Sequence, residues 1–310
     1  MTSDKKELAI FLGTTGNMAF AAANVIQSIK KHSGYLNPDI ILYHENLSEE
    51  DKEVMNSILP CRFYDYKFPN VEADTFKNTH FYRYSMLAYS RYEIFNFLKE
   101  YKNIIWLDID ILIQYDIKKL IDSCDGDMGM YQEKHTFGGL FIDKTVAEFD
   151  NDRKFFNTGV ILYKDTILNY EILTQWCYDK TFEYAEQLSL PDQAIINMMF
   201  QVFPEIKIRP IDRKFNCHPT DENVKNAVIV HSYDSEKFWN FYYGFKEWNE
   251  NYKQWKKMGG SHYKGIKAPI LYVWIKKFFP MAPNPFRQTG KFFIYMFKLL
   301  IGKEKRERWY

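Results

Sequence analysis

The chain has few cysteines, almost no net charge and no long apolar run, and each shortage limits what the protein can be. Its four cysteines include no Cys-x-x-Cys pair, which excludes a zinc knuckle or thioredoxin-like motif, and we expect reduced thiols in a cytoplasmic protein. No apolar run approaches the roughly 18 residues that cross a bilayer. The 41 Lys and Arg nearly cancel the 40 Asp and Glu, so we expect no nucleic-acid partner.

The near-zero net charge hides a basic C-terminal tail. Residues 261–310 hold 11 Lys and Arg against 2 Asp and Glu, a balance of +9. The first 260 residues hold 30 basic and 38 acidic groups, a balance of −8. Apolar residues make up 46% of the chain, which is enough for a packed core. With a Gly-Gly-Ser boundary at residue 259, we predict a catalytic domain at 1–258 and a basic aromatic tail at 259–310.

Apolar runs alternate with helical patterns along the body. Residues 8–12 form an apolar run, 13–17 a glycine-containing turn, and 18–31 a segment with apolar positions at helical spacing. Further strands are predicted at 39–43, 62–66, 103–107, 128–131, 160–163, 206–209 and 228–230. Further helices are predicted at 48–59, 85–100, 172–187 and 192–200. This alternation indicates an α/β fold with a mostly parallel, Rossmann-like sheet that carries helices on both faces.

The sharpest local motif is Ile-Ile-Trp-Leu-Asp-Ile-Asp at residues 104–110. Ligands bind beyond the carboxyl ends of strands in open α/β sheets, and two aspartates spaced i and i+2 there can share a hard divalent cation. Asp108 and Asp110 are therefore candidate metal ligands, although two ordinary solvated aspartates would give the same pattern. A haloacid-dehalogenase-like phosphatase also uses such a pair, but it usually carries Thr or Val where this chain has Leu112.

Five stretches, in this order and spacing, resemble the family 8 retaining glycosyltransferases. They are Ala88–Arg91, Ile104–Leu112, Phe156–Val160, Asp192–Asn197 and His231–Trp239. The similarity covers residues 8–240 and is closest to bacterial lipooligosaccharide galactosyl- and glucosyltransferases, with glycogenin more distant. It implies a GT-A fold and transfer of a hexose, galactose or glucose, from a UDP-sugar to a sugar hydroxyl of a bacterial surface glycan.

The resemblance assigns roles to individual residues. Asp108, Asp110 and His231 would ligate Mn²⁺ or Mg²⁺, and an imidazole ligand favours Mn²⁺. Gln193 and Asp192 would be the catalytic pair. The donor and its nucleotide would be bound by Thr15, Asn17, Arg91, Asp108, Ile109, Asn157 and Lys237. Without the family context, each of these would be an ordinary turn, surface or core residue.

Two stretches depart from the family pattern. The family has His-x-x-Gly-x-x-Lys-Pro-Trp where this chain keeps His231, Lys237 and Trp239 but has Asp234 for the glycine. Many members have Asp-Asp-Asn where this chain reads Thr15-Gly16-Asn17, so the uracil contact passes to a Thr hydroxyl or is lost.

The tail mixes Lys and Arg with large aromatic residues, and two short helices are predicted at 270–279 and 291–300. Basic residues beside apolar ones suit a helix in the interface of an anionic membrane. We therefore expect a peripheral protein on the cytoplasmic face of the inner membrane, with a lipid-linked glycan acceptor. A tail packed on the body is the alternative, and a non-catalytic membrane-surface binding protein is a further one.

Overall fold

The computed structural model describes residues 5–69, 75–78, 85–233, 236–241, 243–269, 272, 273, 275 and 289–300. Contacts divide the chain into a large unit, residues 1–233 and 246–263, and a small unit, residues 234–245 and 264–310. The two are described separately below. The division at residue 259 suggested by the sequence stays a prediction.

A seven-stranded sheet of order β3-β2-β1-β4-β7-β6-β8 forms the centre of the large unit. Its strands are β1 (Lys6–Thr15), β2 (Asp39–Glu45), β3 (Cys61–Asp65), β4 (Tyr101–Leu107), β6 (Met128–Thr136), β7 (Lys154–Lys164) and β8 (Ile208–Pro210). The pairings of β3, β2, β1 and β4 are parallel, as is that of β6 with β8. Strand β7 runs antiparallel to both of its neighbours, β4 and β6. The predicted α/β fold with a mostly parallel sheet is confirmed.

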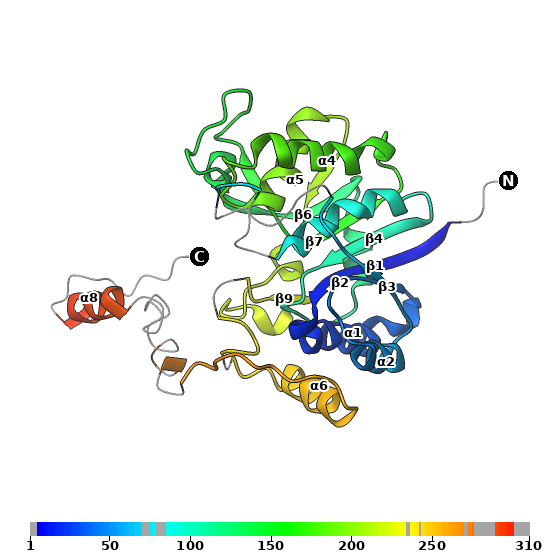
Figure 1. Cartoon of the computed structure of the whole chain (residues 1–310), viewed down its shortest axis with the longest axis vertical. Helices are drawn as coiled ribbons and strands as arrows, with labels where there is room; N and C mark the ends of the chain where they lie inside the picture. The colour runs from blue at the N-terminus through cyan, green and yellow to red at the C-terminus, as the bar shows by residue number, and fades with distance from the viewer. Residues whose placement is uncertain are drawn as a thin grey trace. The chain divides into compact units, whose positions relative to one another are not determined.

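Helices cover both faces of this sheet (Figure 1). Helices α1 (Ala19–Ser33) and α2 (Glu49–Ile58) lie on one side, and α4 (Tyr170–Tyr184) and α5 (Pro191–Val202) lie on the other. Four alanines of α1, at positions 19 and 21–23, are fully buried, and their small side chains allow close packing on the sheet. Strand β4 is buried from Ile104 to Leu107 because it is covered on both faces, as its continuous apolar run predicts.

The remaining elements of the large unit are short helices and a second sheet. Strands β5 (Ile111–Ile113) and β9 (Ile229–His231) pair antiparallel in that sheet. The helices are α3 (Lys118–Ser123), α6 (Lys246–Lys257) and the 3₁₀ segments η1 (Gly16–Met18), η2 (Gly34–Leu36), η3 (Met86–Phe97), η4 (Phe137–Leu140), η5 (Arg213–Phe215) and η6 (Val224–Asn226).

Several element predictions need correction or addition. The helix expected at 85–100 is the 3₁₀ helix η3, in which Ser90 and Arg91 donate side-chain hydrogen bonds to carbonyls three residues earlier. The sequence did not reveal β5, α3 or α6. Helix α6 buries Trp248 and Trp255, whose spacing of seven residues is typical of one helix face. The many charged residues between and beside them make the apolar periodicity too weak to predict a helix.

The small unit is held by contacts around Glu236. Tyr272 donates to the Glu236 carboxylate at 2.5 Å, and Tyr243 donates to the Glu236 carbonyl at 2.8 Å. The amide of Ala268 donates to the carbonyl of Asn240 at 2.6 Å. These bonds tie residues 236–243 to the first part of the tail.

The helix predicted at 291–300 is present as α8 (Thr289–Leu300). The one predicted at 270–279 falls mostly outside the described residues. Phe293 and Phe297 of α8 are 66% and 62% exposed. In the part of the chain that the structure describes, every helix is too short or too polar to span a bilayer.

Candidate metal and donor site

The two aspartates of the Asp-x-Asp motif flank the turn between β4 and β5. Strands β1 and β4 are parallel neighbours, with Phe11 opposite Trp106, so the ends of both strands meet at one edge of the sheet. Asp108 follows β4 directly, and Asp110 directly precedes β5. This is the edge at which open α/β sheets bind ligands.

His231 reaches this edge through the second sheet. Strand β5 pairs with β9 in a register that sets Ile111 opposite His231. The amide of Ser232 also donates to the carbonyl of Asp110 at 2.9 Å. A residue more than a hundred positions away in the sequence is therefore held beside the motif by backbone bonds.

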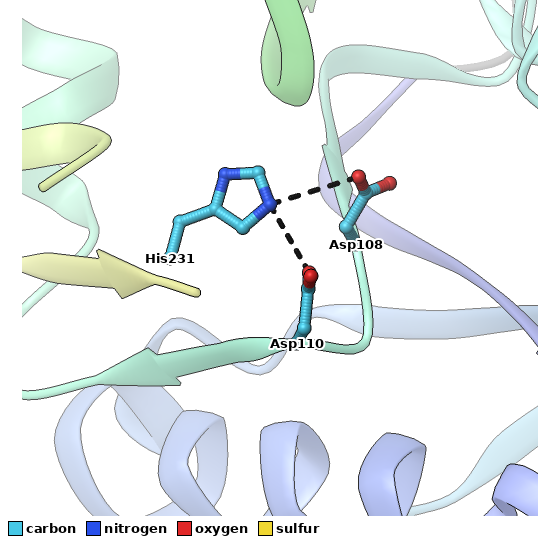
Figure 2. Close-up of side chains that lie close together, drawn as sticks. All are labelled: Asp108, Asp110 and His231. Carbon is cyan, nitrogen blue, oxygen red and sulfur yellow. Dashed lines mark ion pairs between the residues drawn. The ribbon is translucent and has the colours of Figure 1, made fainter. Parts of the chain in front are cut away.

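The three side chains converge on one point (Figure 2). His231 Nε2 lies 3.1 Å from Asp110 Oδ1 and 3.8 Å from Asp108 Oδ2. One ligand atom from each residue lies within 4.8 Å of the others. Asp110 and His231 are 8% and 2% exposed, so water screens their charges little. Two carboxylate oxygens and an imidazole nitrogen form a donor set that suits a divalent cation such as Mn²⁺, so the residues fit the expected metal.

The stretch Asn157–Gly159 of β7 organises the ligands. The amide of Asp108 donates to the carbonyl of Gly159 at 2.9 Å. A Cβ on Gly159 would lie 2.0 Å from Cε1 of His231, so the imidazole packs directly against this glycine. Asn157 accepts from the Gly159 amide at 3.0 Å, although the family resemblance assigns it to the donor sugar.

Arg91 is buried between two acidic groups. Its Nη2 lies 3.1 Å from Asp108 Oδ1, and its Nη1 lies 2.9 Å from Asp192 Oδ2. Burial opposes the charged form, but these two carboxylates outweigh it and hold the pKa of Arg91 above its ordinary value. Arg91 and the indole of Trp106 both donate to Asp108 Oδ1, which leaves Oδ2 as the oxygen that faces His231.

Asp192 and Gln193 stand in the first turn of α5, where the helix dipole favours negative charge. Burial raises the pKa of Asp192, and the attraction of Arg91 only partly offsets that rise. Gln193 Oε1 accepts from the amide of Thr158 at 3.2 Å. Asp192 Oδ2 accepts from the Thr158 hydroxyl at 3.3 Å. The predicted catalytic pair is therefore bonded to the same stretch of β7 that bonds Asp108 and packs against His231.

The remaining residues that the family resemblance assigned to the donor or its nucleotide lie outside this cluster of side chains. Thr15 ends β1 at the same sheet edge and Asn17 lies in η1 just after it, and the Thr15 hydroxyl donates to Asn17 at 2.5 Å. Ile109 lies half-buried between the two aspartates. Lys237 belongs to the small unit, so its contact with the diphosphate stays a prediction. Asp234 is outside the described residues.

Two residues of the site were missed by sequence reasoning. Asn216 is fully buried and lies 2.7 Å from Nδ1 of His231. Asn197 binds both the amide and the carbonyl of Phe156, which fixes α5 against β7. Asn197 belongs to a stretch that the resemblance had marked, whereas Asn216 stands in an irregular segment without a motif.

Known proteins resemble the chain in sequence. Residues 9–258 match the family model described as glycosyl transferase family 8. Glycosyltransferase GlyA of Streptococcus pneumoniae serotype 4 (strain ATCC BAA-334 / TIGR4) is 24% identical over 241 residues, which cover 75% of this chain and 31% of GlyA. The chain therefore spans less than a third of GlyA's length. Galactinol synthase 7 of Arabidopsis thaliana is 24% identical over 249 residues, 71% of this chain and 70% of that protein.

A solved structure shares the fold. Galactosyltransferase LgtC, in complex with donor and acceptor sugar analogues, superposes with a TM-score of 0.62 at 16% identity, over 81% of this chain and 99% of that chain. The likeness confirms the predicted GT-A fold. The family match supports a glycosyltransferase over the phosphatase that the Asp-x-Asp motif alone left open. Because the matched residues 9–258 are well over half of its length, the chain belongs to glycosyl transferase family 8.

Proposed function

We propose that this protein transfers a hexose, galactose or glucose, from a UDP-sugar to a sugar hydroxyl of a bacterial surface glycan, with retention of the α configuration. The convergence of Asp108, Asp110 and His231 beside Asp192 and Gln193 carries the proposal. Asp108 and the catalytic pair are bonded to one stretch of β7, so a diphosphate bound through a cation would have its sugar beside the catalytic pair.

Asp108, Asp110 and His231 would hold a divalent cation, Mn²⁺ in our proposal, which would supply charge stabilisation to the leaving diphosphate. The two carboxylate oxygens of Asp108 have different partners. Oδ1 is held by Arg91 and Trp106, and Oδ2 faces the ligand cluster. Lys237 adds a second positive charge to the diphosphate. Thr15 and Asn17 bind the nucleotide, and Ile109 packs against it.

A front-face displacement suits the residues at the reacting centre. Retaining glycosidases use a carboxylate nucleophile, whereas the matching position here is the amide Gln193. Its Oε1 already accepts from the amide of Thr158, which turns the NH₂ group toward other partners. Gln193 and Asn157 then orient donor hydroxyls, and the diphosphate oxygen takes the proton of the incoming sugar hydroxyl. Asp192 keeps Arg91 in place beside Asp108.

The tail supports attachment to an anionic membrane surface, on the cytoplasmic face of the inner membrane, where a lipid-linked acceptor would lie. Phe293, Ile294, Phe297 and Leu300 of α8 are all more than half exposed. Lys291 and Lys298 lie on the same short helix, within a segment whose charge is +9. Exposed apolar side chains beside cations suit burial in the lipid interface.

The metal proposal predicts that UDP binding, measured by isothermal titration calorimetry, needs Mn²⁺ and disappears with chelator. Asp110→Asn removes one negative charge from the metal ligands at a residue that is 8% exposed, and it should abolish measurable Mn²⁺-dependent affinity for UDP. Asp125→Asn is the matched control, because the Asp125 side chain is 81% exposed and should leave affinity unchanged. Full UDP affinity in the presence of chelator would contradict the metal site. If the protein also transfers no hexose, the result would favour a non-catalytic protein.

Gly159 offers a second test that leaves every ligand in place. In Gly159→Ala the new Cβ would lie 2.0 Å from the His231 ring, so the imidazole must move. We expect a fall of about 10-fold or more in Mn²⁺-dependent UDP affinity, the range seen when the surroundings of a ligand are altered. In the control Gly139→Ala, the Cβ meets nothing within 4 Å. Equal affinities in the two variants would show that the ring position is unimportant.

The stereochemical course follows from the proposed reaction. An α-linked UDP-hexose should yield an α-linked product, because UDP leaves and the acceptor hydroxyl arrives on the same face of the sugar. The coupling constant of the anomeric proton in the product, measured by NMR, decides this. A β-linked product would discredit the roles of Asp192 and Gln193.

The tail prediction is tested on vesicles that contain anionic phospholipid. Phe293→Ser with Phe297→Ser should weaken co-sedimentation by about 10-fold or more, because two exposed apolar side chains no longer enter the lipid. Attachment should also weaken with salt, because the Debye length is about 3 Å at 1 M. Transfer to a soluble acceptor should persist in this variant.

A matched pair elsewhere serves as the control. Leu168→Ser with Ile142→Ser removes exposed apolar groups from the large unit, where they are 64% and 45% exposed. This variant should bind vesicles like the wild type. If both pairs behave alike, α8 has no special part in membrane binding, and the tail is a surface-packed segment.

A further inference from the structure

We propose that Asn216 is a positioning residue of the metal site: it holds the His231 imidazole in the tautomer whose proton is on Nδ1, so that the Nε2 lone pair faces Asp108 and Asp110. The functional consequence rests on the proposed metal site, whereas the tautomer is a property of the chain itself. A line of hydrogen bonds fixes this tautomer, and it starts from a donor whose role cannot change.

That line begins at the backbone N–H of Gly159, which can only donate. The side chain of Asn157 receives it at 3.0 Å, so the atom that faces Gly159 must be the Asn157 oxygen. The same oxygen lies 2.9 Å from the side-chain amide of Asn216. An oxygen can only accept, so Asn216 must turn its NH₂ group toward Asn157. Both amide orientations are thus fixed by one backbone N–H.

The last link sets the tautomer of the histidine. With its NH₂ group turned to Asn157, Asn216 presents its oxygen to Nδ1 of His231 at 2.7 Å. A carbonyl oxygen cannot donate, so Nδ1 carries the proton. A neutral imidazole has one N–H, which leaves Nε2 as a lone-pair donor toward the carboxylates, 3.1 Å from Asp110. Metal-bound histidines commonly give their other N–H to such a partner.

Burial makes the alternative tautomer costly. Asn216 is fully buried and His231 is 2% exposed, so water cannot replace a lost bond. A proton on Nε2 would leave the Nδ1 lone pair against the Asn216 oxygen at 2.7 Å, two acceptors facing each other inside the protein. In the Nδ1–H tautomer the Nε2 lone pair faces Asp110 Oδ1 at 3.1 Å, which is the position that a cation would fill. The imidazole packs directly against Gly159, whose missing side chain leaves room for the ring in this position. Asn216 thus acts through His231.

The test measures the tautomer directly in the metal-free full-length chain. Two-dimensional ¹H–¹⁵N NMR with labelled histidine distinguishes Nδ1–H from Nε2–H, at a pH where the spectrum shows a neutral ring. His231→Gln identifies the His231 signals by their loss. We expect Nδ1–H in the wild type. In Asn216→Leu, which has a similar volume but no acceptor, we expect a shift to Nε2–H and a 10- to 100-fold loss of Mn²⁺-dependent UDP affinity, roughly the range for such partners.

Two further variants separate positioning from structure. Asn216→Asp keeps an acceptor oxygen for Nδ1, so it should retain the wild-type tautomer that Asn216→Leu loses. Its second oxygen faces the Asn157 oxygen at the place of the lost NH₂ group, so the tautomer and not the Mn²⁺ affinity is the readout for this variant. Asn226→Leu makes the same substitution at an exposed residue and serves as the control. It should change neither the His231 tautomer nor the Mn²⁺-dependent UDP affinity.

The outcomes are distinguishable. An Nε2–H signal in the wild type overturns the proposal, even if Asn216→Leu fails to fold. The proposal is also overturned if Asn216→Leu keeps both the wild-type tautomer and the wild-type affinity. If the wild type shows Nδ1–H yet binds no UDP with Mn²⁺, the assignment of Asn216 stands and the proposed function fails.

Discussion

The antiparallel pairing of β4 with β7 is the constraint on which the site depends. It sets Leu107 opposite Val160 and brings the Asp108 amide to the Gly159 carbonyl. On one side, residues 157–159 then position His231, through Asn216 and through the absent side chain of Gly159. On the other side, Thr158 bonds Arg91 and the first turn of α5. The candidate metal ligands and the proposed catalytic pair are therefore positioned by the same stretch of β7.

The charges of the site follow from this arrangement. Asp108, Asp110 and Asp192 lie close together, and Arg91 bridges two of them. Charges in a poorly hydrated site interact strongly, so an arginine alone leaves an excess of negative charge near His231. A bound cation, with the imidazole as a neutral ligand, balances that excess.

The sequence predicted those features whose physical signal lies in neighbouring residues. The apolar run before Asp108 predicts a buried strand and hence the sheet edge. The approach of His231 depends on the pairing of β5 with β9, which no local pattern specifies. The family resemblance anticipated His231 as a ligand but not this strand pairing. Asn216 could not be recognised at all, since its role arises from bonds to residues 59 and 15 positions away.

The central claim is that two aspartates and His231 bind the cation that carries the nucleotide. Pulsed electron paramagnetic resonance of the Mn²⁺–UDP complex measures this directly, because a nitrogen bound to Mn²⁺ gives a characteristic coupling. We predict a coupling from one histidine nitrogen, which changes with ¹⁵N-histidine labelling and disappears in His231→Gln. A tightly bound Mn²⁺–UDP complex without any histidine coupling would contradict the account.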